Sequence, residues 1–264
     1  MSAKESTIAA PKPNVFDDFD PEVRVRTKKM LMYFIIFAIV MLFAGITSAY
    51  ILSNTGTYWV HINPPAALTW SIASVVISSA TMIVASRAMK NGNKQLSLIM
   101  MIATFSFGIL FTVTQLQGWA DLRSKGMGWT DVETEAGIAT SWNNIEKITG
   151  EYGIEADYYV YQDGKILDYQ NGDFYAPSDP LKEKPITRQV LANTNNSGAF
   201  IWVLIWVHII HLAFGLIYLL VNIFRIMADK ITPKDNVRLH TNGLYWHFMG
   251  ILWVYLFVFL FIIH

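Results

Sequence analysis

Three histidines that could bind a haem or a metal, or could move a proton, lie with one glutamine in otherwise apolar stretches of the sequence. His208 and His211 are three residues apart, so they share one face of a helix. His247 lies in the following apolar stretch, and Gln115 lies near the end of an earlier one. Because a polar side chain inside a lipid bilayer is costly, these are the most informative positions in the chain.

Three chemistries compete for the histidines. The pair His208 and His211 cannot supply both axial ligands of one haem, whereas His211 with His247 could in principle. A metal site lacks a nearby carboxylate or thiolate, so no complete set of metal ligands is expected. The reading we favour is structural: hydrogen-bonded histidines join two helices, each bond contributing roughly 0.6 to 2 kcal/mol. No charged residue accompanies them, so a proton relay through this chain alone is not expected.

The elements that position these residues follow from the distribution of charge. Of the 264 residues, 40 are charged, and four long stretches have no charge: residues 30–86, 95–120, 189–224 and 239–264. Helices of a soluble protein need a polar face, so this distribution excludes a soluble globular enzyme. The absence of cysteine excludes disulfides, iron–sulfur clusters and thiolate metal sites, and the net charge of zero gives no reason to expect a nucleic-acid partner.

The uncharged stretches predict an all-α polytopic membrane protein with five transmembrane helices in a bundle. A helix needs about 20 apolar residues to cross roughly 30 Å of hydrocarbon, so the first stretch is long enough for two crossings, divided at Ser53–Pro65 by turn-forming residues. The predicted spans are Met30–Leu52, Ala66–Ser86, Leu96–Leu116, Ala199–Phe224 and Leu244–Ile263.

Basic residues predict the orientation. Thirteen Lys and Arg lie in the N-terminal segment and in the connections between the second and third and between the fourth and fifth spans, against none at the opposite short ends. The positive-inside rule then places the N-terminus in the cytoplasm and the C-terminus outside. The polar segment before the first span makes a signal peptide unexpected, and the membrane we expect is the bacterial cytoplasmic (inner) membrane, which the protein crosses several times. The expected parts are a cytoplasmic segment 1–29, helices one to three in 30–120, an extracytoplasmic loop 121–197 and helices four and five in 198–264.

The long loop looks partly folded. It carries thirteen acidic and seven basic residues, and Asp163–Gly164 and Asn171–Gly172 lie between aromatic and β-branched residues, which predicts a small β-hairpin or meander. Ser141–Ile148 is a candidate short helix. The loop could be a docking surface for a partner subunit, an electron donor or another complex, or an elaboration with only a local role. The Trp and Tyr residues near span ends are expected to form aromatic belts (Tyr50, Tyr58, Trp59, Trp119, Tyr245 and Trp246).

Taken in order, the motifs of the membrane part resemble subunit III of the haem–copper terminal oxidases, in its five-helix form. They are Leu-Phe-Ala-Gly at 42–45, Asn-Pro-Pro at 63–65, the segment 107–115 that ends at Gln115, Trp-Val-His-Ile-Ile-His at 206–211, and Tyr-Trp-His-Phe at 245–248. The resemblance covers about 190 residues.

The resemblance implies an accessory subunit that holds no haem or copper itself. It would pack against catalytic subunit I, and against subunit II, and stabilise the core that reduces dioxygen to water and pumps protons in aerobic electron transport. His208, His211 and His247 match packing or hydrogen-bonding positions of the family, and Lys29 and Arg225 match basic residues near phospholipid head groups. Arg225 is equally well placed to be an ordinary positive-inside anchor.

Two other readings stay open: a membrane cytochrome b with histidine ligands in the last two helices, and subunit III of a quinol oxidase. The chain also departs from the family pattern. Ile39, Gly118 and Gly250 stand where many relatives have acidic residues, and the loop of some 75 residues is much longer than usual. No role that rests on those carboxylates transfers, and the loop inherits no function from the resemblance.

Overall fold

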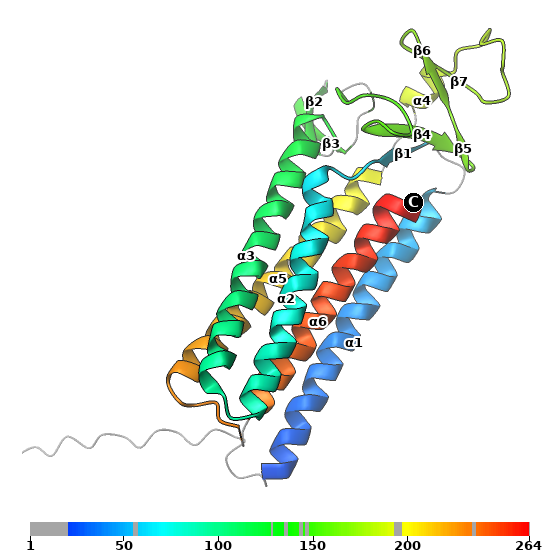
Figure 1. The fold of residues 1–264 in the computed structure, drawn as a ribbon. Helices are drawn as coiled ribbons and strands as arrows, with labels where there is room; N and C mark the ends of the chain where they lie inside the picture. Colours follow the sequence, from blue (N-terminus) through cyan, green and yellow to red (C-terminus); the bar gives the residue numbers. More distant parts are fainter. Residues whose placement is uncertain are drawn as a thin grey trace, which may run out of the picture.

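Five long helices run side by side and form a bundle (Figure 1). The computed structural model describes residues 21–54, 58–127, 129–134, 137–142, 145, 148–192, 197–233 and 236–263. The helices are α1 (Pro21–Asn54), α2 (Ala66–Lys90), α3 (Lys94–Ser124), α5 (Ser197–Met227) and α6 (Val237–Val258), which continues as a π-helical turn, η2 (Phe259–Ile263). All five are long and apolar enough to cross a membrane. The predicted fold class is confirmed.

The helices extend beyond the predicted spans, most of all at the start of α1. This helix begins at Pro21, nine residues before Met30, and its 34 residues give a length of about 51 Å, well over the roughly 30 Å of hydrocarbon. Its first turns carry the basic residues that were expected in an N-terminal segment 1–29. Residues 1–20 of that segment lie outside the described part of the chain.

The two ends of the bundle differ in character. The start of α1, the α2–α3 turn and the α5–α6 connection lie together at one end, and the strands lie at the other (Figure 1). We call these the basic end and the cap end. At the basic end α2 passes to α3 through Asn91–Gly92–Asn93, where Gly92 has a φ of +81° and the Asn93 side chain accepts a hydrogen bond from the Leu96 amide at 3.0 Å.

Helix α6 is the most enclosed element and α1 the least. Within the most apolar 18 residues of each helix, more than half of the residues are buried in α6 with its continuation η2, against 17% in α1. Helices α2 and α3 form the most extensive pair, while α6 contacts α1, α2 and α5. Gly118 of α3 allows the closest approach in this pair, because a Cβ atom built there would lie 2.5 Å from the Leu68 side chain of α2.

The cap end carries seven short strands and one short helix, mostly from the long loop. They are β1 (Trp59–Ile62), β2 (Trp129–Thr134), β3 (Gly137–Trp142), β4 (Tyr158–Gln162), β5 (Lys165–Ile166), β6 (Asp168–Gln170), β7 (Asp173–Tyr175) and α4 (Thr187–Ala192). The pairs β4–β5 and β6–β7 turn at Asp163–Gly164 and Asn171–Gly172, and all four of these residues have positive φ, as a two-residue hairpin turn requires. The predicted hairpins are confirmed.

The predicted break between the first two helices at Ser53–Pro65 is confirmed, because α1 ends at Asn54 and α2 begins at Ala66. The connection also contains β1, which was not predicted and which pairs antiparallel with β4 from Trp59↔Tyr161 to Ile62↔Tyr158. The helix expected at Ser141–Ile148 does not begin there, since Ser141 and Trp142 belong to β3, which pairs with β2. Residues 143–144 and 146–147 of that prediction lie outside the described residues. We refer to residues 58–62 and 148–192 together as the strand cap.

Candidate functional site

His208 of α5 is enclosed at the centre of the bundle. Its side chain is 1% exposed, and its ring packs against Trp253 of α6 and Phe111 of α3, with centroid distances of 5.4 and 6.3 Å. Neither ring nitrogen has a hydrogen-bond partner among the described residues. The ring borders a cavity of about 10 Å³, which is the size of one water at most.

His211 bonds within its own helix rather than across to α6. Its Nδ1 lies 2.7 Å from the Val207 carbonyl oxygen of α5. The bond between the two helices uses the backbone of His211 and not its side chain, because the Tyr245 hydroxyl of α6 donates to the His211 carbonyl oxygen at 2.8 Å. The imidazole lines a cavity of about 440 Å³ between α1, α5 and α6, and Ile39 closes the same cavity on the α1 side.

His247 faces the opposite side of α6. It lines two cavities between α2 and α6, of about 290 and 580 Å³. The expectation that histidine side chains join the last two helices by hydrogen bonds is therefore wrong for His208 and His211, and no such bond is seen for His247 in the described part of the chain.

The positions of the three histidines do not fit a haem. A bis-histidine haem needs two imidazoles that reach one cavity large enough for a porphyrin. Here each histidine lines different cavities, and the one beside His208 is far too small. Among the described residues, no three His, Cys, Asp or Glu lie close enough together to hold a metal ion.

The hydrogen bonds that hold α6 to α2 come from tryptophan and serine, a role that the sequence analysis did not predict for either. Trp253 Nε1 donates to Ser71 Oγ at 3.0 Å, and Trp246 Nε1 donates to Ser78 Oγ at 3.1 Å. The two tryptophans are seven residues apart, and so are the two serines. Seven residues make two helical turns, so two antiparallel helices bring each tryptophan level with its serine. That matched spacing was a signal in the sequence. It also explains why Trp246 is buried.

The aromatic-belt interpretation is wrong wherever the aromatic side chain is buried in the bundle or the cap. At most 7% of the side chain is exposed at five of the predicted positions, so these rings pack inside the protein instead of facing lipid: Tyr50, Trp59, Trp119, Tyr245 and Trp246. Trp59 of β1 donates from Nε1 to the Tyr50 hydroxyl of α1 at 3.1 Å, and the two rings meet edge to face.

Several buried polar side chains have no partner within the described chain. Gln115 is 1% exposed, and both its amide atoms are unpaired. Asn222 of α5 and Asn242 of α6 are fully buried, and their amides are likewise unpaired. Native proteins leave few such groups, and each one costs free energy. The two asparagines were missed in the sequence, although an amide in an uncharged stretch is the same signal that identified Gln115.

The two predicted lipid-binding residues both lie at the basic end. Arg225 is in the last turn of α5, and Lys29 lies in the first third of α1; both are partly buried. Neither makes an ion pair with a described residue, whereas Lys94 at the same end is paired with Asp229.

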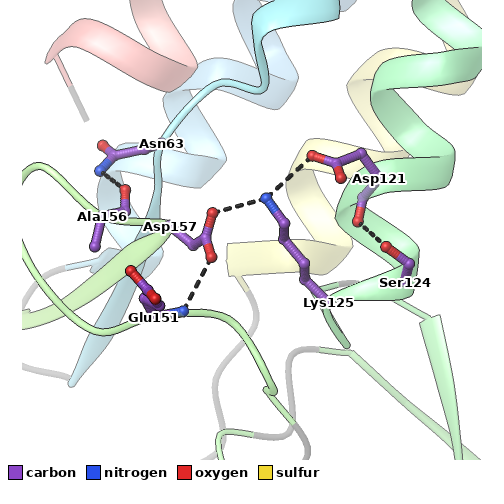
Figure 2. A network of polar contacts seen from close by, with 7 residues as sticks. All are labelled: Asn63, Asp121, Ser124, Lys125, Glu151, Ala156 and Asp157. Carbon is purple, nitrogen blue, oxygen red and sulfur yellow. Dashed lines mark hydrogen bonds and ion pairs between the residues drawn. The ribbon is translucent and has the colours of Figure 1, made fainter.

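Lys125 ties the strand cap to the bundle (Figure 2). Its Nζ lies 2.7 Å from Asp157 of the cap and 3.2 Å from Asp121 of α3. Asp157 also accepts a hydrogen bond from the Glu151 amide at 2.9 Å. The bond from Lys125, helped by that amide, lowers the pKa of the Asp157 carboxyl, and the bond to Asp157 raises the pKa of Lys125.

A second contact joins the cap to the α1–α2 connection. The Asn63 side chain donates to the carbonyl oxygens of Ala156 and Ile154 at 2.5 and 2.9 Å, the first of which is drawn in Figure 2. The Asn63 amide donates to the Asp157 carbonyl oxygen at 2.9 Å. Asn63 begins the Asn-Pro-Pro motif, so this motif of the sequence anchors the strand cap.

The class that the fold and these contacts define is a polytopic helical membrane protein whose identified polar contacts join helices to one another and to a folded cap. Residues 191–264, which include α5 and α6, match the family Cytochrome c oxidase subunit III. This match and the named relatives below support the resemblance to subunit III of the haem–copper oxidases that the motifs predict, over the last two helices.

Individual relatives are similar over short segments. Cytochrome c oxidase subunit 3 of Alkalihalophilus pseudofirmus is 32% identical over 65 residues, which are 25% of this chain and 32% of that protein. The protein of the same name from Schizophyllum commune is 37% identical over 51 residues, 19% of each chain. Cytochrome bo(3) ubiquinol oxidase subunit 3 of Buchnera aphidicola is 34% identical over 59 residues, 22% of this chain and 31% of that protein. The chain thus spans about a third or less of the length of these relatives.

Proposed function

We propose that this chain is an accessory, cofactor-free subunit III of a respiratory haem–copper oxidase. It packs against catalytic subunit I and contacts subunit II, and it stabilises a complex that reduces dioxygen to water and pumps protons. The observation that carries the proposal is the family match over α5 and α6. The separate cavities of the three histidines support a scaffold role, because among the described residues these histidines do not share a cavity that could hold a haem.

The proposal includes an orientation and a lipid contact. The basic end faces the cytoplasm of a bacterial inner membrane, and the strand cap lies outside, because positive charge collects at the end that holds the turns between helices. Lys29 and Arg225 then lie at the level of phospholipid head groups. The contacts of Lys125 and Asn63 with the strand cap support a local role for it in holding the ends of the helices together, and docking of another respiratory complex on the cap is the alternative within the same proposal.

A quinol-fed oxidase is a second candidate, favoured by the relatives named cytochrome bo(3) ubiquinol oxidase subunit 3. The two candidates differ only in the electron donor of the assembled complex. Neither candidate gives this chain a haem.

The test is to place an affinity tag on this chain in its native host and purify what accompanies it. We expect haem a or haem o in the complex, together with subunits I and II, and loss of the haem signal when the complex is dissociated and this chain is isolated. A complex without either haem would refute the proposal. A Soret band retained by the isolated chain and abolished by His247→Ala would instead establish the cytochrome b reading. Oxidation of reduced cytochrome c or of a quinol by the intact complex decides between the two donors.

A further inference from the structure

A groove between α2 and α6 joins a cationic site at the basic end to an apolar site deeper in the bundle. The cationic part has a volume of about 290 Å³, and Arg87, Lys90 and His240 line it. The apolar part has a volume of about 580 Å³, and Val76 and Ile251 line it. His247 borders both parts, so they adjoin along the same two helices. We call the two parts together the α2–α6 groove.

Matched stripes in the sequence form the walls. The groove residues of α6 are spaced by four and three, which places them on one face of the helix: Asn236, His240, Gly243, His247, Gly250 and Val254. Those of α2 follow the same spacing: Val76, Ser79, Ile83, Ser86 and Lys90. Both stripes are polar at the basic end and become apolar away from it, so the groove as a whole is amphipathic.

Two glycines of α6 let the helices approach while they leave the groove open. A Cβ atom built at Gly250 would lie 3.2 Å from Val75 Cγ2, and one at Gly243 would lie 3.4 Å from Met82 Cε. Along α2, the groove extends from Val75 to Lys90. Fifteen residues of helix rise about 22 Å, more than the roughly 15 Å that make up half of the hydrocarbon core.

The cations in the groove lack counter-ions from the described part of the chain. Arg87 and Lys90 are exposed, and no carboxylate of the described residues pairs with either. Lys94, one turn further along the chain, is by contrast paired with Asp229. Lys29 of α1 and Lys90 both lie near enough to His240 to act on it electrostatically, so Lys29 adds a cation close to this mouth of the groove.

We propose that the α2–α6 groove binds one phospholipid of the leaflet at the basic end. Arg87 and Lys90 hold the phosphate of its head group, and an acyl chain lies along Val76, Ile251 and Val254. Unpaired cations that line a pocket between helices at the head-group level bind anionic phosphate. A partner helix would use the apolar part but would leave both cations without a partner. Neither Lys29 nor Arg225 lines the groove, and the site does not depend on the chain's being an oxidase subunit.

The test uses the full chain in detergent and native mass spectrometry, with phosphatidylglycerol titrated as the probe. The variant Arg87→Gln/Lys90→Gln is compared with Arg26→Gln/Lys28→Gln, which removes the same charge at the same end of the bundle but outside the groove. We expect one retained lipid for the wild type and the control. The groove variant should bind it roughly 25-fold more weakly, at about a factor of five for each cation.

Three outcomes would overturn the proposal. The first is equal retention of lipid by all three proteins, and the second is an equal loss in both variants, which would indicate only general attraction of an anionic lipid to a basic surface. The third is that excess inorganic phosphate alone displaces the lipid or protects the site from binding it, which would indicate a site for a free anion. None of these outcomes bears on which haem or which subunits co-purify with the chain.

A second measurement locates the acyl chain. In native membranes loaded with a phospholipid that carries a photoreactive group on its acyl chain, we expect cross-links to the peptides that contain Val76 and Ile251. Narrowing the groove with Val254→Trp should remove these cross-links and leave those on the outer face of α1 unchanged. If Ile251 cross-links to another protein subunit in the intact complex instead, a partner helix occupies the groove and the lipid proposal is wrong.

Discussion

The ion pair between Lys125 and Asp157 offers the most direct test of how the strand cap is attached. We consider Asp157→Asn, because the amide oxygen of the new side chain can still accept the bond from the Glu151 amide. The substitution therefore removes mainly the charge that faces Lys125.

The expected cost is set by the partial exposure of the pair. The side chains of Lys125 and Asp157 are 33% and 28% exposed, so solvent screens part of their attraction. A charge-assisted bond at 2.7 Å in such a place contributes about 1 kcal/mol, the upper part of the range for exposed pairs. One kcal/mol corresponds to a factor of about five in the equilibrium for local opening of the cap.

The dependence on pH has a defined sign. The folded state lowers the pKa of Asp157 below its usual 3.8, so this contribution is present above about pH 4 and is lost as the pH falls through the folded value. The folded state raises the pKa of Lys125 above its usual 10.5, so the same pair weakens again only when the pH rises through that higher value. Between these limits the pair should contribute a constant amount.

Hydrogen exchange followed by mass spectrometry measures this opening. The amides of Asn63 and Thr149 report on it, because they donate to the carbonyl oxygens of Asp157 and Lys125. We expect about fivefold lower protection in Asp157→Asn at neutral pH, and none of this difference at a pH below the folded pKa. The matched control is Asp163→Asn in the exposed β4–β5 turn, which should leave protection unchanged. If the two variants behave alike, Lys125 does not hold the cap and the reasoning is refuted.

Two further predictions concern buried polar groups inside the bundle, and both are checked by unfolding of the chain in mixed micelles. Ser78→Ala removes the acceptor of Trp246 Nε1 and should destabilise the fold by about 1 kcal/mol, with Ser79→Ala as a neighbouring control; an unchanged stability would show that the bond at 3.1 Å contributes nothing. His208→Phe removes a ring without hydrogen-bond partners among the described residues, so the free energy of unfolding should change by less than about 1 kcal/mol. A loss of twice that size would mean that His208 has a partner, such as a water in the adjoining cavity.

The sequence was sufficient to predict the helices, because hydrocarbon imposes a minimum length of apolar residues on any helix that crosses it. It also predicted the two hairpins, since Asp-Gly and Asn-Gly adopt the positive φ that the turns need. The pairing of β1 with β4 was not predictable in this way. The two strands lie almost a hundred residues apart, and the first is a four-residue segment with no turn signal of its own.

The roles of the polar residues were harder to predict than their burial. His208 and Gln115 are as deeply buried as the uncharged stretches imply, but the sequence does not say whether a buried group finds a partner. The expectation for the histidines failed because α5 presents the His208 ring to aromatic side chains and because His211 bonds to its own helix. Spacing alone could have identified Ser78 and Trp246, since matched intervals on two antiparallel helices bring such pairs together.

The pairing of β1 with β4 also constrains how the chain can be made. Ribosomes deliver roughly 5 to 20 residues per second, and the 96 positions between Ile62 and Tyr158 therefore take on the order of 5 to 20 s to follow. During that interval α1 and α2 must already have been inserted, while the strand between them waits with its backbone amides and carbonyls unpaired. Final assembly of the cap end is thus a late event in biosynthesis, and a pause or a cleavage within residues 121–157 would leave the first helical pair without the segment that completes it.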